Sequence, residues 1–231
     1  MNWLPHNVDL VLELTSSHLV QSALPVVLGL VISVPLARLA VASRKLRPVL
    51  VNAAALLYTI PSLTLFVVLP VMLGTRITSV INVMVALTVY VVAMMVRSCA
   101  DAFAAVDRAV LQAATAMGYT RWQRFWAAEL PLAAPVMIAG VRTALVANIS
   151  MVSVGAIIGV QSLGTLFTDG LRRGIVEEIV VGVVLTVALA VTLDQVLRLL
   201  GTLMTRWQRS DPTACHATHS LHRRPTIGGA L

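Results

Sequence analysis

Long apolar runs constrain this chain more than any other feature of its sequence. Five of them occupy residues 19–42, 48–74, 77–96, 133–160 and 175–200. Each is long enough to cross the hydrocarbon core of a bilayer as an α-helix, which takes about 20 residues. Only 12% of the residues are charged and 58% are hydrophobic, so the chain carries roughly half the charge of a soluble domain. The sequence therefore predicts an all-α integral membrane protein with about five transmembrane helices.

The positions of Arg and Lys predict how these spans are oriented. The segments that follow the first, third and fifth spans carry most of them, including Arg44, Lys45, Arg47, Arg97, Arg108, Arg121, Arg124, Arg198, Arg206 and Arg209. The opposite side has only Arg76, Arg172 and Arg173. Cytoplasmic loops are enriched in positive charge, so the N-terminus is expected outside and the C-terminus in the cytoplasm. An odd number of spans requires the same arrangement.

Three regions follow from this pattern. Residues 1–18 are expected to form an extracytoplasmic N-terminal segment, residues 19–200 the transmembrane domain, and residues 201–231 a cytoplasmic tail. The tail contains three evenly spaced histidines, His216, His219 and His222, which could form a metal face on a helix. Poor helix propensity there favours a disordered tail without a metal. The net charge of +7 is interpreted as the membrane orientation bias and contact with anionic lipid, not as binding of nucleic acid.

An amphipathic segment, residues 97–131, separates the third and fourth spans. Its apolar residues recur at helical spacing, at Val110, Ala114, Met117, Trp122 and Phe125. This periodicity predicts an amphipathic helix over about residues 108–127, in which Gly118 could end the first half of the helix or form a turn. Such a helix either lies in the membrane interface or docks on a partner protein, and periodicity alone does not separate the two.

The chain lacks the motifs of an ATP-binding or hydrolytic enzyme. A phosphate-binding loop needs Gly-Lys followed by Ser or Thr, whereas the sole lysine, Lys45, follows Ser43 and Arg44. Neither Gly-x-Ser-x-Gly nor His-Glu-x-x-His occurs. We therefore expect no catalytic residue and no cofactor, and any ATP-driven role requires a separate ATPase chain.

Polar residues inside the spans leave two interpretations open. Pro61 removes a backbone donor in the second span and predicts a kink or a broken helix, and Thr59 and Ser62 beside it either satisfy the freed groups or line a path. Further polar residues in the fourth span are Asn148, Ser150 and Ser153. They either line the same path or form hydrogen bonds between helices.

Charged residues inside the spans are few. Arg142, near the start of the fourth span, either is a buried functional charge or, as we expect, snorkels to the cytoplasmic interface. The acidic residues of the fifth span, Glu177, Glu178 and Asp194, lie toward its ends. A carrier driven by protons or sodium usually has ionisable groups near mid-bilayer, so this class is disfavoured. Gly155 and Gly159 are expected to allow close helix approach.

The segment between the third and fourth spans also resembles a known motif. The residues that match this motif at the same spacing are Gln112-Ala113-Ala114, Gly118 and Leu130-Pro131. The motif is the Glu-Ala-Ala loop of ABC importer permeases, in which a short helix docks on a separate ATPase subunit. Gln112 replaces the family's Glu, and Ala128 replaces its Ile. The resemblance implies that Ala113, Ala114 and Gly118 contact the ATPase and that Leu130-Pro131 set the angle into the fourth span.

The resemblance extends over most of the chain. Thr59-Ile60-Pro61-Ser62-Leu63 is similar to a signature of osmoprotectant permeases, as are Pro35-Leu36, Val106-Asp107, Leu163-Gly164 and Gly170-Leu171. The chain is identified as a member of the MetI-like superfamily of ABC importer permeases, osmoprotectant subfamily. This implies a MetI-like permease fold with a cytoplasmic coupling helix, in a bacterial inner membrane. It also implies a cargo such as glycine betaine, choline, carnitine or proline.

The implied partners are ABC ATPase subunits, a second permease chain in a homodimer or heterodimer, and an extracytoplasmic substrate-binding protein. Three alternatives remain. The same fold could import an amino acid, because the docking loop does not contact the cargo. The chain could instead be an ATP-independent channel or secondary carrier, or a membrane-anchored scaffold or sensor.

Overall fold

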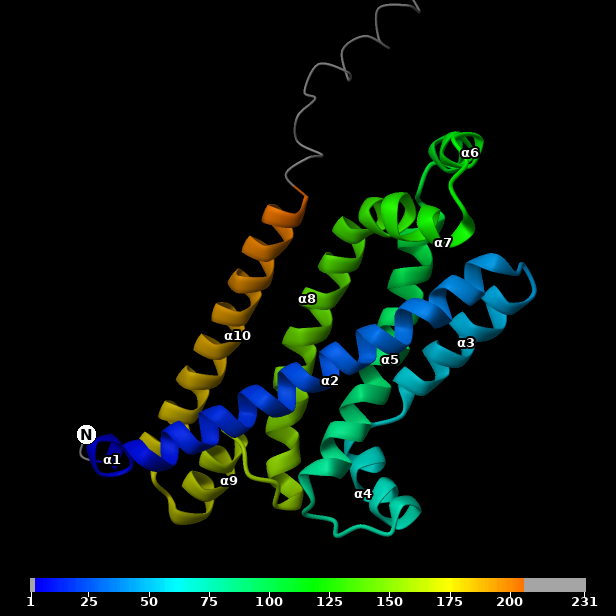
Figure 1. Cartoon of the computed structure of the whole chain (residues 1–231). Coiled ribbons are helices and arrows are strands. Elements are labelled where there is room, and N and C mark those ends of the chain that lie inside the picture. Colours follow the sequence, from blue (N-terminus) through cyan, green and yellow to red (C-terminus); the bar gives the residue numbers. More distant parts are fainter. Residues whose placement is uncertain (1–2, 206–231) are drawn as a thin grey trace, which may run out of the picture.

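The computed structural model describes residues 3–205, and this part of the chain is helical with no strand (Figure 1). The α-helices are α1 (Trp3–His6), α2 (Val8–Ala42), α3 (Leu46–Thr59), α4 (Ser62–Leu73), α5 (Val80–Ala104), α6 (Arg108–Ala116), α7 (Arg121–Arg124), α8 (Leu130–Gly155), α9 (Gly164–Arg173) and α10 (Val176–Met204). A π-helical turn, Phe125–Glu129, joins α7 to α8, and a 3-10 turn, Ala156–Ile158, follows α8. The histidines expected in the tail lie outside the described residues.

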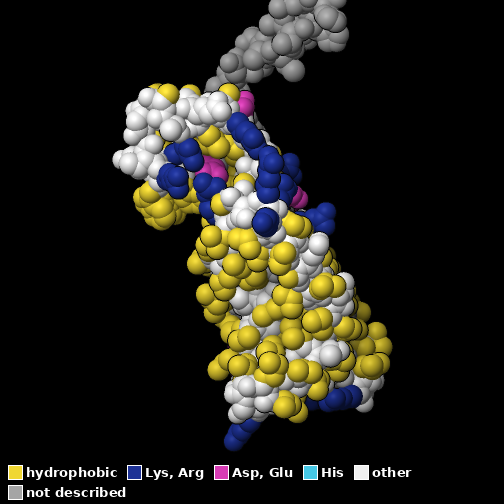
Figure 2. All heavy atoms as spheres, turned by 90° about the vertical axis from the view of Figure 1, so that its right-hand side faces the viewer, with side chains coloured by type: hydrophobic (Ala, Val, Ile, Leu, Met, Phe, Trp, Pro, Cys, Tyr) yellow, Lys and Arg dark blue, Asp and Glu magenta, His cyan; other side chains and the backbone are white. Residues whose placement is uncertain are grey.

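The number of membrane spans agrees with the sequence prediction. Four helical runs are long and apolar enough to cross a membrane: α2, α5, residues Arg121–Ile158 and α10. The pair α3 and α4 passes the same test together and makes a fifth, bent by 99° at its break. In Figure 2, apolar side chains cover the middle of the molecule, and Lys and Arg gather mainly at one end with a few at the other. This distribution is typical of a protein that spans a bilayer.

The break predicted at Pro61 is confirmed, and the backbone carbonyl at the break receives a hydrogen bond from another helix. Ile60 and Pro61 are extended between α3 and α4, as the residue before a proline prefers. The hydroxyl of Tyr90 in α5 donates a hydrogen bond to the carbonyl of Ile60. Thr59 instead donates to Leu56 O in its own helix at 2.7 Å. The bend is therefore held by α5 and not by Thr59.

Two predicted boundaries differ from the structure. The helix α2 begins at Val8, before the apolar run predicted from residue 19, because Val11 and Leu14 continue its buried face while Asp9 and Glu13 are exposed. Residues 1–18 are thus mostly part of α2. The helix predicted over residues 108–127 is divided into α6 and α7, because Gly118 takes a left-handed conformation with φ of 87°. Single apolar periodicity does not report such a turn.

The core forms where α2, α5 and α8 pack against one another. Its buried members include Ala37, Val91, Met95, Cys99, Phe103, Met137 and Ile149. Gly29 of α2 lies so close to α5 that a Cβ there would collide with the Val91 side chain. The close approach expected at Gly155 is looser, since a Cβ there would meet Val83 at 3.5 Å. Gly159 lies beyond the 3-10 turn and not in a helix contact.

Buried polar residues of α2 fasten this helix to α8 and to the loop before α9. The His18 imidazole lies 3.1 Å from the carbonyl of Ile149 through Nε2, and its Nδ1 accepts from the Leu163 backbone N–H at 3.3 Å. Because Nδ1 accepts, the ring carries its proton on Nε2 and donates it to Ile149. Gln21 donates to Gln161 O at 2.8 Å. Polar groups in a bilayer need such internal partners.

We predict that Gly29→Ala destabilises the protein, because the added methyl group enters the α2–α5 contact. Overpacking of this kind typically costs about 1–3 kcal/mol. The measurement is the unfolding temperature of the purified protein in detergent. Gly155→Ala is the matched control, since its methyl group meets only ordinary contacts, and it should unfold at or above the wild-type temperature. Equal temperatures for both variants would contradict the assigned contact.

Candidate functional site

The first candidate site is a helix–turn–helix unit formed by α6 and α7 at one end of the molecule (Figure 1). Asp107 caps α6, its carboxylate accepting from the Ala109 N–H at 2.8 Å. Thr120 and Gln123 form a reciprocal capping box that begins α7. Arg124 of α7 donates to the Thr115 hydroxyl of α6 at 2.9 Å. These bonds give the two short helices a defined relative position.

The unit presents part of the predicted docking surface. Gln112, Ala113 and Gly118 are exposed, whereas Ala114 is only 5% exposed and faces the chain itself. Large exposed hydrophobic side chains surround the turn, namely Val110, Met117, Tyr119, Trp122 and Trp126. Two grooves, of about 420 Å³ and 670 Å³, flank it on the α6 and α7 sides. An exposed apolar patch of this extent marks a surface that contacts a protein or a membrane.

The unit is anchored to the spanning helices at its C-terminal end. Leu130 and Pro131 form the first turn of α8 and follow directly on the π-helical turn, in which the Leu130 N–H donates to Phe125 O. Glu129, just before them, is buried and pairs with Arg38 of α2 at 3.1 Å. The Arg38 guanidinium also lies 6.0 Å from the centre of the Phe125 ring. Movement of α7 would therefore displace both α2 and α8.

The residues predicted for a translocation path do not come together within the described chain. Asn148 is buried and donates to Ser22 O of α2 at 2.8 Å, so it forms a bond between helices. Ser150 is exposed and donates to Val146 O at 3.4 Å in its own helix, and Ser153 has a buried hydroxyl with no partner. A cavity lies between the α3–α4 bend and the polar residues of α8 and is lined by Tyr58, Tyr90 and Asn148 among others. Its volume is about 10 Å³, the size of one water.

Thr59 and Pro61 are exposed beside the bend, and Ser62 is half-buried at the start of α4. They are separated from Ser150, which faces a different groove lined by α8 and Asp194. A path lined both by the residues at the bend and by Ser150 would need surfaces that the described part of this single chain does not enclose. The role of these residues in transport stays a prediction.

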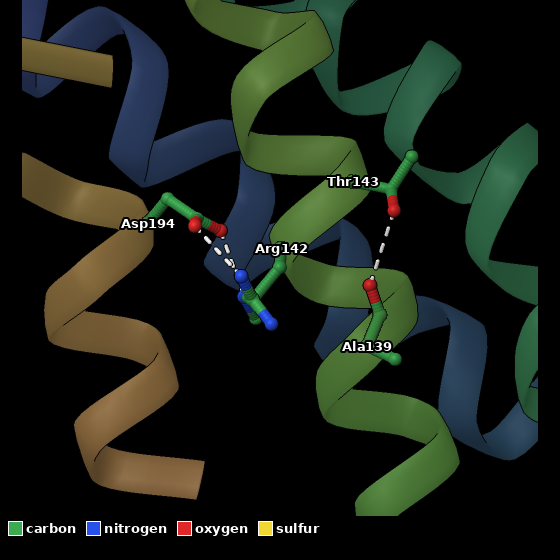
Figure 3. A network of polar contacts seen from close by, with 4 residues as sticks. All are labelled: Ala139, Arg142, Thr143 and Asp194. Atoms are coloured by element: carbon green, nitrogen blue, oxygen red, sulfur yellow. Dashed lines mark hydrogen bonds and ion pairs between the residues drawn. The ribbon is translucent and has the colours of Figure 1, made fainter. Parts of the chain in front are cut away.

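An ion pair inside the spans was not expected. The Arg142 guanidinium of α8 donates two hydrogen bonds to the Asp194 carboxylate of α10, each at 2.7 Å (Figure 3). The prediction that Arg142 snorkels to the interface is therefore wrong, because the side chain extends sideways to a neighbouring helix. The available signal was an arginine within the fourth apolar run and an aspartate within the fifth, which also contains Glu177, Glu178 and Arg198. His18 and the Thr120–Gln123 capping box were also missed, although a Thr-x-x-Gln pattern is a helix-start signature.

Comparisons with known proteins agree with this architecture. Residues 26–210 match the family described as binding-protein-dependent transport system inner membrane component. The chain is 33% identical to the osmoprotectant import permease protein OsmW of Salmonella typhimurium, over 89% of this chain and 96% of that protein. It is 29% identical to the glycine betaine/carnitine/choline transport system permease protein OpuCB of Bacillus subtilis, over 85% of this chain and 89% of that protein.

Solved structures show the same fold. The methionine ABC transporter MetNI in inward-facing conformations aligns with a TM-score of 0.71 at 21% identity, covering 87% of this chain and 97% of that chain. An amino acid ABC transporter solved with histidines aligns with a TM-score of 0.67 at 15% identity, covering 88% and 96%.

The chain is thus a multi-pass membrane protein of the MetI-like fold. It belongs to the family of inner membrane components of binding-protein-dependent transport systems, the permeases of ABC importers.

We predict that Asn148→Ala lowers the unfolding temperature in detergent, because it removes the hydrogen bond that Asn148 donates to Ser22 O across the α2–α8 contact. Hydrogen bonds between membrane helices contribute about 0.6 kcal/mol on average and up to about 1.7. Ser150→Ala is the control, since its hydroxyl bonds only to its own helix, and it should leave the temperature unchanged. An unchanged temperature for Asn148→Ala would show that the bond contributes nothing.

Proposed function

We propose that this chain is the membrane-spanning subunit of an ATP-driven importer of osmoprotectants such as glycine betaine, carnitine, choline or proline. The similarity to the osmoprotectant permease of Salmonella typhimurium over nearly its whole length carries this proposal. The other relatives reported above bear names for the same cargo class. An amino acid remains the second candidate cargo, because the structural neighbours are named as methionine and amino acid transporters, although likeness at that identity concerns the fold alone.

The α6–α7 unit is the proposed contact for an ABC ATPase subunit. Its exposed apolar patch has no covering element in the described chain, and the Arg38–Glu129 pair joins it to α2 and α8. ATP hydrolysis belongs to that separate subunit. Closure of the ATPase would move the unit as a rigid body and would shift α8 against its neighbours.

The assembly also requires a second permease chain and a separate extracytoplasmic substrate-binding protein. About five spans enclose little volume, and the cavity near Asn148 measures about 10 Å³, the size of one water. A path between two copies, or between this chain and a related one, overcomes this limit. By the positive-inside rule, the α6–α7 end with its cluster of arginines faces the cytoplasm, which places the N-terminus outside and the C-terminus inside.

We expect gene-dependent uptake of labelled glycine betaine when this chain is expressed with its ATPase and binding protein in cells that lack other betaine carriers. Uptake should rise with external osmolarity if the system serves osmoprotection. The matched control expresses the same proteins with an ATPase that cannot hydrolyse ATP, and it should show no accumulation. Accumulation in that control would favour an ATP-independent carrier, and uptake of methionine or histidine alone would favour an amino-acid importer.

We predict that Gly118→Asp weakens association with the ATPase by at least about tenfold, which corresponds to about 1.4 kcal/mol. The change adds bulk and negative charge in the middle of the exposed turn. Co-purification of the ATPase with the permease from detergent extracts measures it.

Gly74→Asp is the matched control for backbone strain. Gly74 and Gly118 both have a left-handed conformation with nothing within 4 Å of an added Cβ, but Gly74 ends α4 at the opposite end of the molecule (Figure 1). The control should insert and bind the ATPase normally. Equal binding by both variants would place the contact elsewhere.

A further inference from the structure

The Arg142–Asp194 pair lies deep in the membrane-spanning part of the chain. Arg142 stands near the middle of α8 (Leu130–Gly155), about 18 Å from its start at a rise of 1.5 Å per residue. Asp194 is about 15 Å from the C-terminal end of α10 (Val176–Met204). Both positions lie within helical runs that are long and apolar enough to cross a membrane. Charges at this depth are rare and face a protein partner or a water-filled path.

The pair is not closed off from its surroundings. The Arg142 side chain is 34% exposed and the Asp194 side chain 23% exposed. Both line a groove of about 630 Å³ together with Ala139, Thr143, Val146, Ala147 and Ser150. A solute of modest size can therefore reach both charges from the same side.

The composition of this groove is unlike a surface that faces lipid. Along α8, the exposed positions are Val136, Ala139, Thr143, Val146 and Ser150, which share one face at helical spacing; Ala139 is small, and Thr143 and Ser150 carry hydroxyl groups. By contrast, α10 exposes mainly large apolar side chains, including Val180, Val184, Val187, Val191, Leu199 and Leu203. The face of α10 is suited to lipid tails, whereas the groove on α8 is suited to polar contents.

The hydroxyl groups of the groove are available for a ligand. Thr143 donates to Ala139 O at 3.2 Å (Figure 3), and Ser150 donates to Val146 O at 3.4 Å. Both acceptors already belong to the helical backbone ladder, so rotation about χ1 frees each hydroxyl without leaving a carbonyl unpaired. They add polar contacts next to the two charges.

We propose that this groove is a binding site for a zwitterionic solute, with Arg142 holding the carboxylate and Asp194 facing the cationic end. The proposal rests on the proposed function, because it names the substrate class of the path. Arg142 and Asp194 compensate each other's charge, and the Arg198 guanidinium, one turn further along α10, also lies within electrostatic range of Asp194. A zwitterion with separated charges replaces both contacts at once, whereas a solute of net charge leaves one member of the pair unpaired at low dielectric.

The site therefore discriminates among osmoprotectants. Glycine betaine, carnitine and proline each have a carboxylate for the Arg142 fork, which suits planar two-oxygen acceptors. Choline has a quaternary ammonium and no carboxylate, so its binding to Asp194 would leave Arg142 without a partner. The groove lining contains no aromatic ring, so the cationic end is held by the Asp194 charge and not by an aromatic cage.

The test uses the complete transporter reconstituted in lipid vesicles, with ATP on the side of the membrane where the ATPase subunits lie. The variant is Arg142→Gln together with Asp194→Asn, because removing both charges leaves no buried unpaired ion. We expect ATP-dependent transport of glycine betaine to fall about tenfold or more, with a smaller change for choline. The binding protein is the same in every sample, so a change in the ratio of betaine transport to choline transport arises from the permease.

The matched control removes an exposed ion pair, Arg47–Asp101, which lies at 3.1 Å on the surface. Arg47→Gln with Asp101→Asn should keep the wild-type ratio. A direct measurement accompanies it: equilibrium binding of labelled glycine betaine to the purified permease–ATPase complex without the binding protein. The site is supported if the wild type binds glycine betaine and the variant Arg142→Gln/Asp194→Asn does not. Excess choline should then fail to displace the bound betaine.

Each remaining outcome is distinct. If the wild type shows no ATP-dependent uptake, the proposed function fails, and the binding measurement still decides whether the groove holds a zwitterion. If the wild type transports and the doubly neutral variant keeps the same rates and ratio, the site is wrong. Loss of all transport together with loss of permease pairing on chemical crosslinking also overturns it, because the pair would then be an interface contact.

Discussion

Hydrocarbon offers no hydrogen-bond partner, and this constraint determines how the helices of this chain are arranged. Three polar groups inside the spans are satisfied by another element of the chain: His18 of α2 bonds to Ile149 and Leu163, Asn148 donates to Ser22, and Arg142 donates to Asp194. Thr59, Thr143 and Ser150 instead donate within their own helices, and the Ser153 hydroxyl has no partner in the described chain. The carbonyl at the α3–α4 bend is satisfied by Tyr90. The bonds between elements connect α2, α5, α8 and α10 across the bundle, and each fixes the rotation of a helix about its axis. The apolar contacts between the same helices are less directional, so they add stability without selecting one rotation.

The same bonds explain which parts of the chain can move together. α2 is fastened to α8 by Asn148 and again by the Arg38–Glu129 pair near the α6–α7 unit. Two contacts at separate depths prevent one helix from sliding along the other without breaking a buried bond. We therefore regard α2, α8 and the α6–α7 unit as one body. α10 packs mainly on α8 and α9, exposes most of its length, and is joined to that body at depth by the Arg142–Asp194 pair.

Composition and proline chemistry predicted the spans and the break at Pro61, because bilayer thickness and the missing proline N–H act locally. The apolar run drawn from the sequence begins at residue 19, whereas α2 begins at Val8, because the exposed Asp9 and Glu13 belong to the same helix as the buried Val11 and Leu14. Ala113, Ala114 and Gly118 share one motif, but only the folded chain shows that Ala114 is turned inward. The Arg142–Asp194 pair joins residues far apart in sequence, so no local pattern could indicate it, and its depth depends on how α8 and α10 pack.

The position of that pair connects the proposed coupling surface with the proposed solute site. Arg142 belongs to α8, which begins at Leu130 directly after the α6–α7 unit, whereas Asp194 belongs to α10. A movement of the unit that shifts α8 but not α10 changes the distance between the two charges. A closed pair has no room for a zwitterion between its members, and a separated pair has two unsatisfied charges that a zwitterion can satisfy. Separation of bare charges in hydrocarbon is costly, so bound solute lowers the cost of the movement. Transport of solute and movement of the coupling unit are then energetically linked through one ion pair.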